Sequence, residues 1–201
     1  MRKDDKRRSR ELAVYEAALS LIGQGCDPAS LTVQQIADAA GIGKGTVYEY
    51  FASKEEILTR MADYTLHSEM SRLTEALAPC CTLVRAEDTL LDYLSGLAGE
   101  RLGKYQVIAR TFARSGAVPE DRVTPELIHG LEQCFGSLVR RLRAAGEIPP
   151  ENDDLYCMHA IASACVTGAI ALSPCARQFL DHVNTERVLA RTRRLLDKAL
   201  R

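Results

Sequence analysis

Apolar residues recur along most of this chain at every third or fourth position, which is the spacing of one face of an α-helix. Leu12, Tyr15, Leu19 and Ile22 show the pattern near the amino terminus. No long segment of the sequence alternates between apolar and polar residues with a period of two, as a half-buried β-strand would. The pattern therefore predicts an all-α protein.

Proline, glycine and capping residues divide the chain into nine predicted helices. Thr124 and Pro125 are expected to begin the seventh helix, and Asn184 to cap the last one. The predicted helices cover about 6–23, two short segments between 32 and 51, and about 53–77, 87–102, 104–114, 125–145, 151–172 and 185–199.

The two short helices between Thr32 and Phe51 have well-defined start and stop signals. Thr32 and Gln35 have the spacing of a capping box, in which each side chain accepts a hydrogen bond from the other residue's amide. Gly41 is placed to end the first helix in the left-handed conformation that a side chain disfavours. These signals predict a helix, a tight turn and a second helix.

The second short helix is too polar to be an ordinary core element. It begins with Gly43, Lys44, Gly45 and Thr46, and the free amides of a helix start favour a phosphate. Tyr48 and Tyr50 are expected to project from this helix, and Phe51 to turn into the core. The composition therefore favours a polar docking surface over a helical hairpin that serves only packing.

A second capping box follows at Ser53–Glu56 and predicts the start of a long helix. Lys54 stands at the amino end of that helix, where it would suit another phosphate.

Residues from about Arg10 to Leu58 resemble the DNA-binding domain of the tetracycline-repressor (TetR) family of bacterial regulators. The matching elements are Thr32, Ile36–Ala37, Gly41, Lys44–Gly45–Thr46, Tyr48, Tyr50–Phe51 and Ser53–Lys54–Glu55. The resemblance implies an all-α chain with a helix-turn-helix domain at 1–52 and a helical-bundle domain for ligand binding and dimerisation at 53–201. It also implies a homodimeric repressor that binds a palindromic operator and is released by a small-molecule inducer.

The resemblance and the polar start of the second short helix together give the expected DNA-binding residues. They are Thr32, Gln34, Gln35, Lys44, Gly45, Thr46, Tyr48, Tyr50 and Lys54. Two positions depart from the family pattern. Gly43 replaces the usual serine or threonine cap, which should cost only a few tenths of a kcal/mol. Glu49 places a carboxylate where it would repel phosphate, so it is left out of the contacts.

The net charge of −1 does not indicate nucleic-acid binding, but the distribution of charge does. The first ten residues hold six basic and two acidic side chains. Such an arm would follow the DNA backbone or enter the minor groove, and the alternative is a solvated tail.

Small residues on the predicted helix at 151–172 suggest a close approach by another helix, within the subunit or across a two-fold axis. The expected dimer residues are Ala160, Ala164, Gly168, Val188, Thr192 and Leu195. Ligand contacts are expected among Tyr93, Tyr105, Phe112, Cys134, Met158 and Cys165, although plain core packing explains each of them as well.

Seven cysteines, an odd number without a CxxC pair, argue against a disulfide framework. Cys157 and Cys165 share a helix side but would be about 12 Å apart, too far for one metal ion. Cys80–Cys81 would suit a soft metalloid or oxidation, so metal or redox sensing stays an alternative. We expect no cofactor.

Other classes have weaker support. GIGKGT resembles a phosphate loop, but Asp38 and Gly45 stand where that motif requires glycine and serine or threonine. No nucleophile elbow or HExxH motif occurs, which argues against an enzyme. We expect no apolar run to be long enough to span a membrane, and the charged amino terminus does not resemble a signal peptide. We therefore expect a cytoplasmic protein without a membrane partner.

Overall fold

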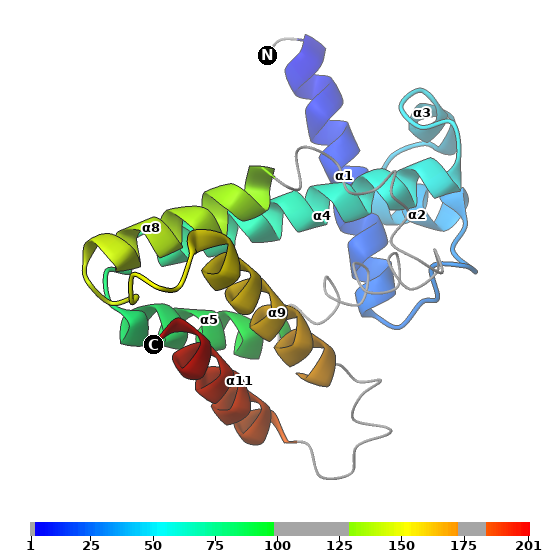
Figure 1. The fold of residues 1–201 in the computed structure, drawn as a ribbon. Coiled ribbons are helices and arrows are strands. Elements are labelled where there is room, and N and C mark those ends of the chain that lie inside the picture. Colours follow the sequence, from blue (N-terminus) through cyan, green and yellow to red (C-terminus); the bar gives the residue numbers. More distant parts are fainter. Residues whose placement is uncertain (1–2, 99–128, 173–183) are drawn as a thin grey trace. The chain divides into compact units, whose positions relative to one another are not determined.

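The computed structural model describes residues 3–98, 129–172 and 184–201, and every regular element in these ranges is helical (Figure 1). The chain falls into two compact units that divide within one long helix, after Leu66. The predicted all-α fold is confirmed.

The first unit contains α1 (Lys3–Gly23), α2 (Val33–Ala40), α3 (Lys44–Tyr48) and the first turns of α4 (Lys54–Leu77). Its core gathers buried apolar side chains from all of these helices and from the turn after α3. They include Val14, Ile22, Ile36, Val47, Phe51, Ile57 and Met61. Because the last two belong to α4, this packing unit extends beyond residue 52, where the sequence analysis placed a domain boundary.

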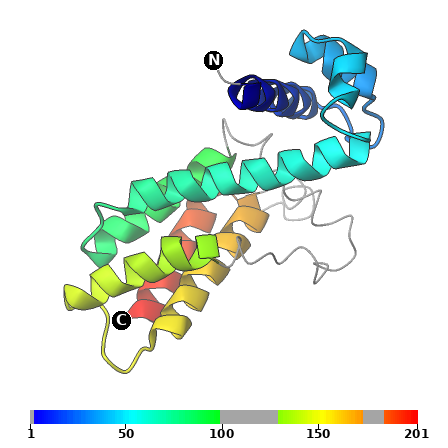
Figure 2. The ribbon, with the colours of Figure 1, turned by 90° about the horizontal axis from the view of Figure 1, so that it is seen from above.

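The second unit contains the rest of α4 and five further elements: α5 (Leu83–Ala98), η2 (Glu132–Gly136), α8 (Ser137–Ala144), α9 (Asp154–Leu172) and α11 (Thr185–Leu200). Helices α5, α9 and α11 pack against one another although they are far apart in sequence (Figure 1, Figure 2). Asn184 caps α11 as predicted, since its side chain accepts from the Arg187 amide at 2.8 Å.

Helix α5 begins at Leu83, four residues before the predicted start at Glu87. Two contacts support this start. Thr82 acts as a local cap, since its Oγ1 accepts from the Arg85 amide at 3.4 Å, and the distant Glu147 carboxylate accepts from the Leu83 amide at 3.0 Å. The predicted helix at 104–114 and the predicted cap at 124–125 lie outside the described residues.

A π-helical turn, η2, interrupts the predicted seventh helix and leads directly into α8. Gly136 lies against Met158 of α9, where an added Cβ would be 3.4 Å from the Met158 Sδ and 3.1 Å from the Glu132 Oε1. The π-turn was not predicted, because the apolar spacing of the segment is compatible with an uninterrupted α-helix.

The small residues of α9 face the interior of the subunit. Ala164 and Gly168 are buried, as are Val188 and Thr192 of α11. An added Cβ at Gly168 would lie only 3.0 Å from the Thr192 Oγ1. The structure therefore corrects the dimer prediction for these four residues, since the stripe lets α11 approach α9 within one chain.

One buried carboxylate lies where α5 meets α11. Glu87 is 3% exposed, and the Arg193 Nη1 lies 3.6 Å from its Oε2 while Arg193 also pairs with Asp88. Burial raises the pKa of Glu87, the nearby Asp197 charge raises it further, and Arg193 opposes the shift.

The expectation that no apolar run reaches the length of a membrane span is wrong for α9. Within the described residues, α9 is long and apolar enough by length and composition to do so, with a mean hydropathy of 1.7. A core helix passes the same test, and only 28% of the apolar window is buried here, so α9 carries much exposed apolar surface.

Candidate DNA-binding site

The first helix of the candidate site is capped as predicted. The Thr32 Oγ1 accepts from the Gln35 amide at 3.2 Å, and the Gln35 Oε1 accepts from the Thr32 amide at 2.9 Å. Gly41 has φ 67° and ψ 29°, and its amide donates to the Ala37 and Asp38 carbonyls. Both ends of α2 are therefore determined by hydrogen bonds that the sequence signals predict.

Helix α3 is short and is attached to the core by its apolar side. Val47 is fully buried within it, and Phe51 is buried just after it at 1% exposure. Phe51 packs edge to face against Tyr15 of α1, with ring centroids 5.7 Å apart. These contacts turn the opposite, polar side of α3 toward solvent.

Arg60 of α4 reinforces the position of Phe51. Its guanidinium carbon lies 5.7 Å from the centroid of the Phe51 ring, and its Nη2 pairs with the Glu56 Oε1 at 2.8 Å. A cation over an aromatic face stabilises both groups. Arg60 was not identified from the sequence, since nothing in its local pattern indicates which ring it covers.

None of the nine predicted DNA-binding residues is buried. Tyr48 is 51% exposed, Lys44 and Gly45 are exposed, and Thr46 is half-buried on α3. Thr32, which caps α2, and Gln34 and Gln35 within α2 are exposed as well. The structure thus presents these residues at the surface of one compact unit.

Two of these nine residues differ from expectation in their local structure. Tyr50 lies after the end of α3 instead of projecting from it, and its hydroxyl accepts a hydrogen bond from the Arg10 Nη1 at 3.1 Å. Lys54 donates from its Nζ to the Ala29 carbonyl at 2.8 Å, so it also ties α4 to the loop before α2.

The second predicted capping box forms with a small change. The Glu56 amide donates to the Ser53 Oγ at 3.1 Å, as predicted. The Glu56 carboxylate, however, accepts from the Ala52 amide at 2.6 Å, one residue earlier than a standard box requires. The Ala52 and Glu56 amides at the start of α4 therefore both have hydrogen-bond acceptors.

The expected ligand-binding residues are only partly brought together. The half-buried Tyr93 donates its hydroxyl to the Glu69 Oε2 at 3.0 Å in the second unit. Cys134 is buried in the core of that unit, and Met158 and Cys165 pack against the same core. Tyr105 and Phe112 lie outside the described residues.

Burial disfavours the thiolate form of three cysteines in the second unit. Burial raises the pKa of Cys165 to about 12, and it also raises the pKa of Cys134 and of Cys157. Since the thiolate is the form that binds metals and reacts with oxidants, these three positions are poorly suited to either role. In the described ranges, no three or more His, Cys, Asp or Glu side chains are grouped to hold a metal ion.

A capped helix, a left-handed glycine turn and a short, polar, core-anchored helix define a helix-turn-helix protein of the DNA-binding class. Comparisons with known proteins agree. A family model for bacterial regulatory proteins of the tetR family matches residues 14–61. The chain is 31% identical to the uncharacterized HTH-type transcriptional regulator MT1294 of Mycobacterium tuberculosis, with 59% of this chain and 70% of that relative covered.

The chain belongs to the TetR family of bacterial regulatory proteins. It is also 30% identical to the uncharacterized HTH-type transcriptional regulator YxbF of Bacillus subtilis, where the match covers 64% of this chain but spans only 32% of that relative.

Solved structures share the fold over nearly the whole chain. The regulator FadR from Bacillus subtilis, in complex with stearoyl-CoA, has a TM-score of 0.67 at 18% identity, covering 94% of this chain and 97% of that one. A TetR transcription regulator from Haloarcula marismortui has a TM-score of 0.65 at 18% identity, covering 98% and 97%.

Proposed function

We propose that this protein is a transcriptional repressor that binds a palindromic operator as a homodimer and is released by a small-molecule inducer. One observation carries the DNA-binding part. Val47 and Phe51 anchor α3 from one side, so that Lys44, Thr46 and Tyr48 remain at the surface. Membership of the TetR family also supports the proposal that the protein binds DNA.

The DNA-binding proposal is tested with fluorescently labelled DNA from upstream of the protein's own gene. Thr46→Ala and Tyr48→Phe should weaken binding while circular dichroism stays unchanged, since both residues lie on the solvent side of α3. Lys54→Ala should weaken binding to all DNA sequences alike. It should also reduce the slope of log K against log salt by about one. Equal affinity of the wild type for operator and for random DNA would contradict the proposal.

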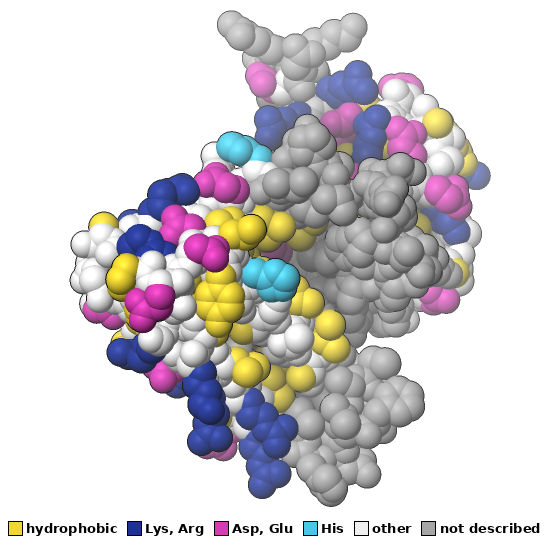
Figure 3. Space-filling view, viewed as in Figure 1, with side chains coloured by type: hydrophobic (Ala, Val, Ile, Leu, Met, Phe, Trp, Pro, Cys, Tyr) yellow, Lys and Arg dark blue, Asp and Glu magenta, His cyan; other side chains and the backbone are white. Residues whose placement is uncertain are grey.

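Exposed apolar side chains on α9 and α11 support a second copy of the chain as partner. Ile170 is 55% exposed and Leu195 is 56% exposed, and hydrophobic side chains gather over α9 on the face shown in Figure 3. Large exposed apolar patches mark interaction sites. A dimer would also present two recognition helices to the two half-sites of an operator.

The dimer proposal is tested by placing a charge on this surface. Ile170→Asp and Leu195→Asp should convert the dimer to a monomer in light scattering, and should weaken operator binding much more than half-site binding. Val84→Asp is the matched control, because Val84 is 52% exposed on α5. Dimers that survive both substitutions would place the interface elsewhere.

An apolar groove between η2 and α9 supports ligand binding in the second unit. Its volume is about 720 Å³, and its lining includes Leu131, Phe135, Met158 and Ala162. Grooves of this size and polarity suit small apolar molecules. The structural neighbour FadR holds stearoyl-CoA, so a long acyl chain is the first ligand to test.

The ligand proposal is tested by a thermal-shift series with stearoyl-CoA, a short-chain acyl-CoA and free CoA. Stearoyl-CoA should raise the melting temperature and release DNA, and free CoA should do neither, because the groove lining is apolar. Ala162→Phe should abolish the shift by filling the groove. If stearoyl-CoA raised the melting temperature of this variant as much as that of the wild type, the ligand would have to bind at another site.

A further inference from the structure

Two segments separated by 40 residues meet at the edge of the helix-turn-helix. The Arg10 Nη1 of α1 donates to the Tyr50 Oη, just beyond α3, at 3.1 Å. Arg10 is exposed and Tyr50 is half-buried, so the pair is open to solvent. The bond joins the basic start of the chain to the end of the recognition helix.

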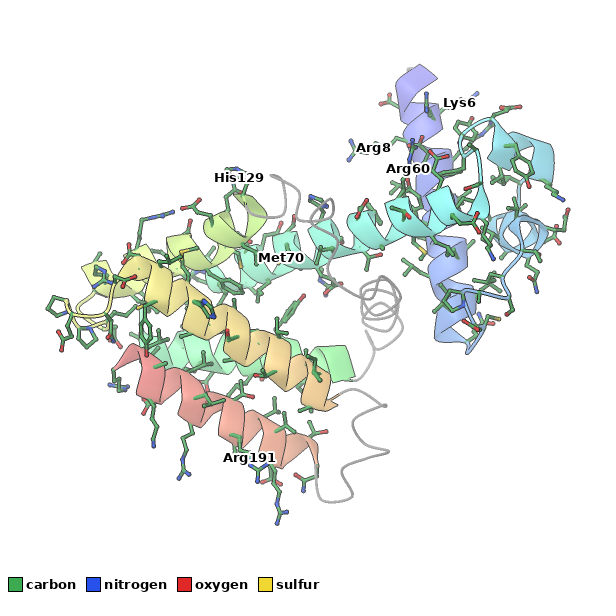
Figure 4. All side chains as sticks on the ribbon, turned by 45° about the vertical axis from the view of Figure 1, so that its right-hand side comes forward. Lys6, Arg8, Arg60, Met70, His129 and Arg191 are labelled. Atoms are coloured by element: carbon green, nitrogen blue, oxygen red, sulfur yellow. The ribbon has the colours of Figure 1, made fainter. Side chains whose placement is uncertain are left out.

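The start of the chain forms a helix in the structure. Helix α1 already begins at Lys3, and residues 5–10 are exposed before the core begins further along the helix. A helix presents only part of its basic side chains to any one surface. Lys6 lies one turn before Arg10 on the same side, whereas Arg8 is about 200° away from Arg10 around the helix. Figure 4 shows Arg8 on the side of α1 away from α3.

The carboxylate of the next residue, Glu11, is paired with cations other than Arg10. The Glu11 Oε1 accepts from Arg7 at 3.1 Å and lies 4.0 Å from Arg60. In the part of the chain that the structure describes, no carboxylate pairs with Arg10. The positive charge beside Tyr50 therefore remains available to an anion.

After forming their mutual hydrogen bond, both members of the pair keep unused hydrogen-bond donors. The Tyr50 oxygen accepts from the guanidinium, which leaves the hydroxyl hydrogen free to be donated outward and polarises it. The guanidinium keeps further N–H groups in a planar fork that matches a phosphate. Two uncharged or acidic side chains at positions 10 and 50 would lack the positive charge that a phosphate requires.

We propose that Arg10 and Tyr50 together bind one backbone phosphate of the DNA flanking the bases that α3 reads. This inference rests on the proposed DNA-binding function and adds α1 to the contact surface. Arg10 contacts the phosphate directly and also orients the Tyr50 hydroxyl toward it. The contact carries no base specificity and instead fixes the register of α3 on the duplex.

Arg10→Gln, Tyr50→Phe, the double variant and Arg8→Gln are compared by fluorescence anisotropy with operator DNA at several salt concentrations. Arg10→Gln should weaken binding by about 10- to 100-fold, as expected for a charge-assisted hydrogen bond. It should also lower the slope of log K against log salt by about 0.9. Arg8→Gln removes the same charge from the opposite side of α1, and should change both quantities much less.

The double variant tests whether the two residues act as a pair. Because both bind one phosphate, its loss of affinity should be clearly smaller than the product of the two single losses. Arg10→Lys keeps the charge, so it should retain most of the salt slope while losing affinity. Urea midpoints should stay close to the wild type for all variants, since Arg10 is exposed and Tyr50→Phe removes only the hydroxyl of a half-buried side chain.

The outcomes separate this inference from the function on which it rests. If the wild type shows no preference for operator DNA, the proposed function fails and the inference fails with it. If the wild type binds but Arg10→Gln behaves like Arg8→Gln, or the double variant is fully multiplicative, only the Arg10–Tyr50 phosphate site is overturned.

Discussion

Replacing Gly168 by alanine tests whether the small residues of α9 serve packing within the subunit. The new Cβ would lie 3.0 Å from the Thr192 Oγ1 and 3.2 Å from the Leu94 Cδ1, both closer than ordinary van der Waals contact. Overpacking of this kind costs about 1–3 kcal/mol. Alanine recovers about 1 kcal/mol of helix propensity relative to glycine. The overpacking cost minus the gain in helix propensity predicts that the free energy of unfolding falls by roughly 1 kcal/mol.

The assay is urea unfolding followed by circular dichroism at several protein concentrations. Because the contacts lie inside one chain, the loss should be the same at every concentration, whereas a dimer-interface residue would change the concentration dependence itself. Adding Thr192→Ala removes two of the crowding atoms, so the double variant should lose less than the sum of the single losses.

Gly130→Ala is the matched control, because Gly130 is helical and an added Cβ there meets nothing within 4 Å. It should raise the free energy of unfolding by up to about 1 kcal/mol. If Gly168→Ala were equally stabilising, or if its effect were independent of Thr192, the packing of α11 against α9 described above would be refuted.

Three further predictions follow from single contacts. Thr32→Ala should lower the free energy of unfolding by about 1 kcal/mol in urea titrations, because α2 loses its cap; an unchanged midpoint would show that the capping box contributes nothing. Gly45→Ala should preserve or raise the unfolding midpoint, since nothing lies within 4 Å, yet weaken operator binding by placing a methyl group on the DNA-facing surface of α3; full affinity would remove Gly45 from that surface. The raised pKa of Glu87 means that the folded state holds its proton more tightly, so this contribution to stability is complete below the unfolded pKa and is lost as pH rises through the folded pKa. As the pH rises above 4.5, Glu87→Gln should therefore lose less stability than the wild type in pH-dependent melting. Parallel stability curves for the two proteins would contradict the raised pKa.

Local signals in the sequence were sufficient for much of the candidate site. The capping box of Thr32 and Gln35, the left-handed Gly41 and the cap at Asn184 all involve groups within a few residues of each other. Such contacts form whenever the segment is helical, whatever the rest of the chain does. The sequence was therefore enough to predict the helical class, the helix-turn-helix and the surface position of its polar residues.

Contacts between distant segments decided the remaining features. Periodicity shows that Ala164 and Gly168 share one side of a helix, but only the packing of α11 turns that side inward. The Glu147 carboxylate meets the first turn of α5 from 64 residues away, and Arg10 meets Tyr50 across 40 residues. No local pattern encodes these pairings, because each is set by how separate helices pack. The sequence by itself determined which segments are helices and how they are capped, and the tertiary structure decided which of their faces are buried, which stay exposed, and which charges stand beside the recognition helix.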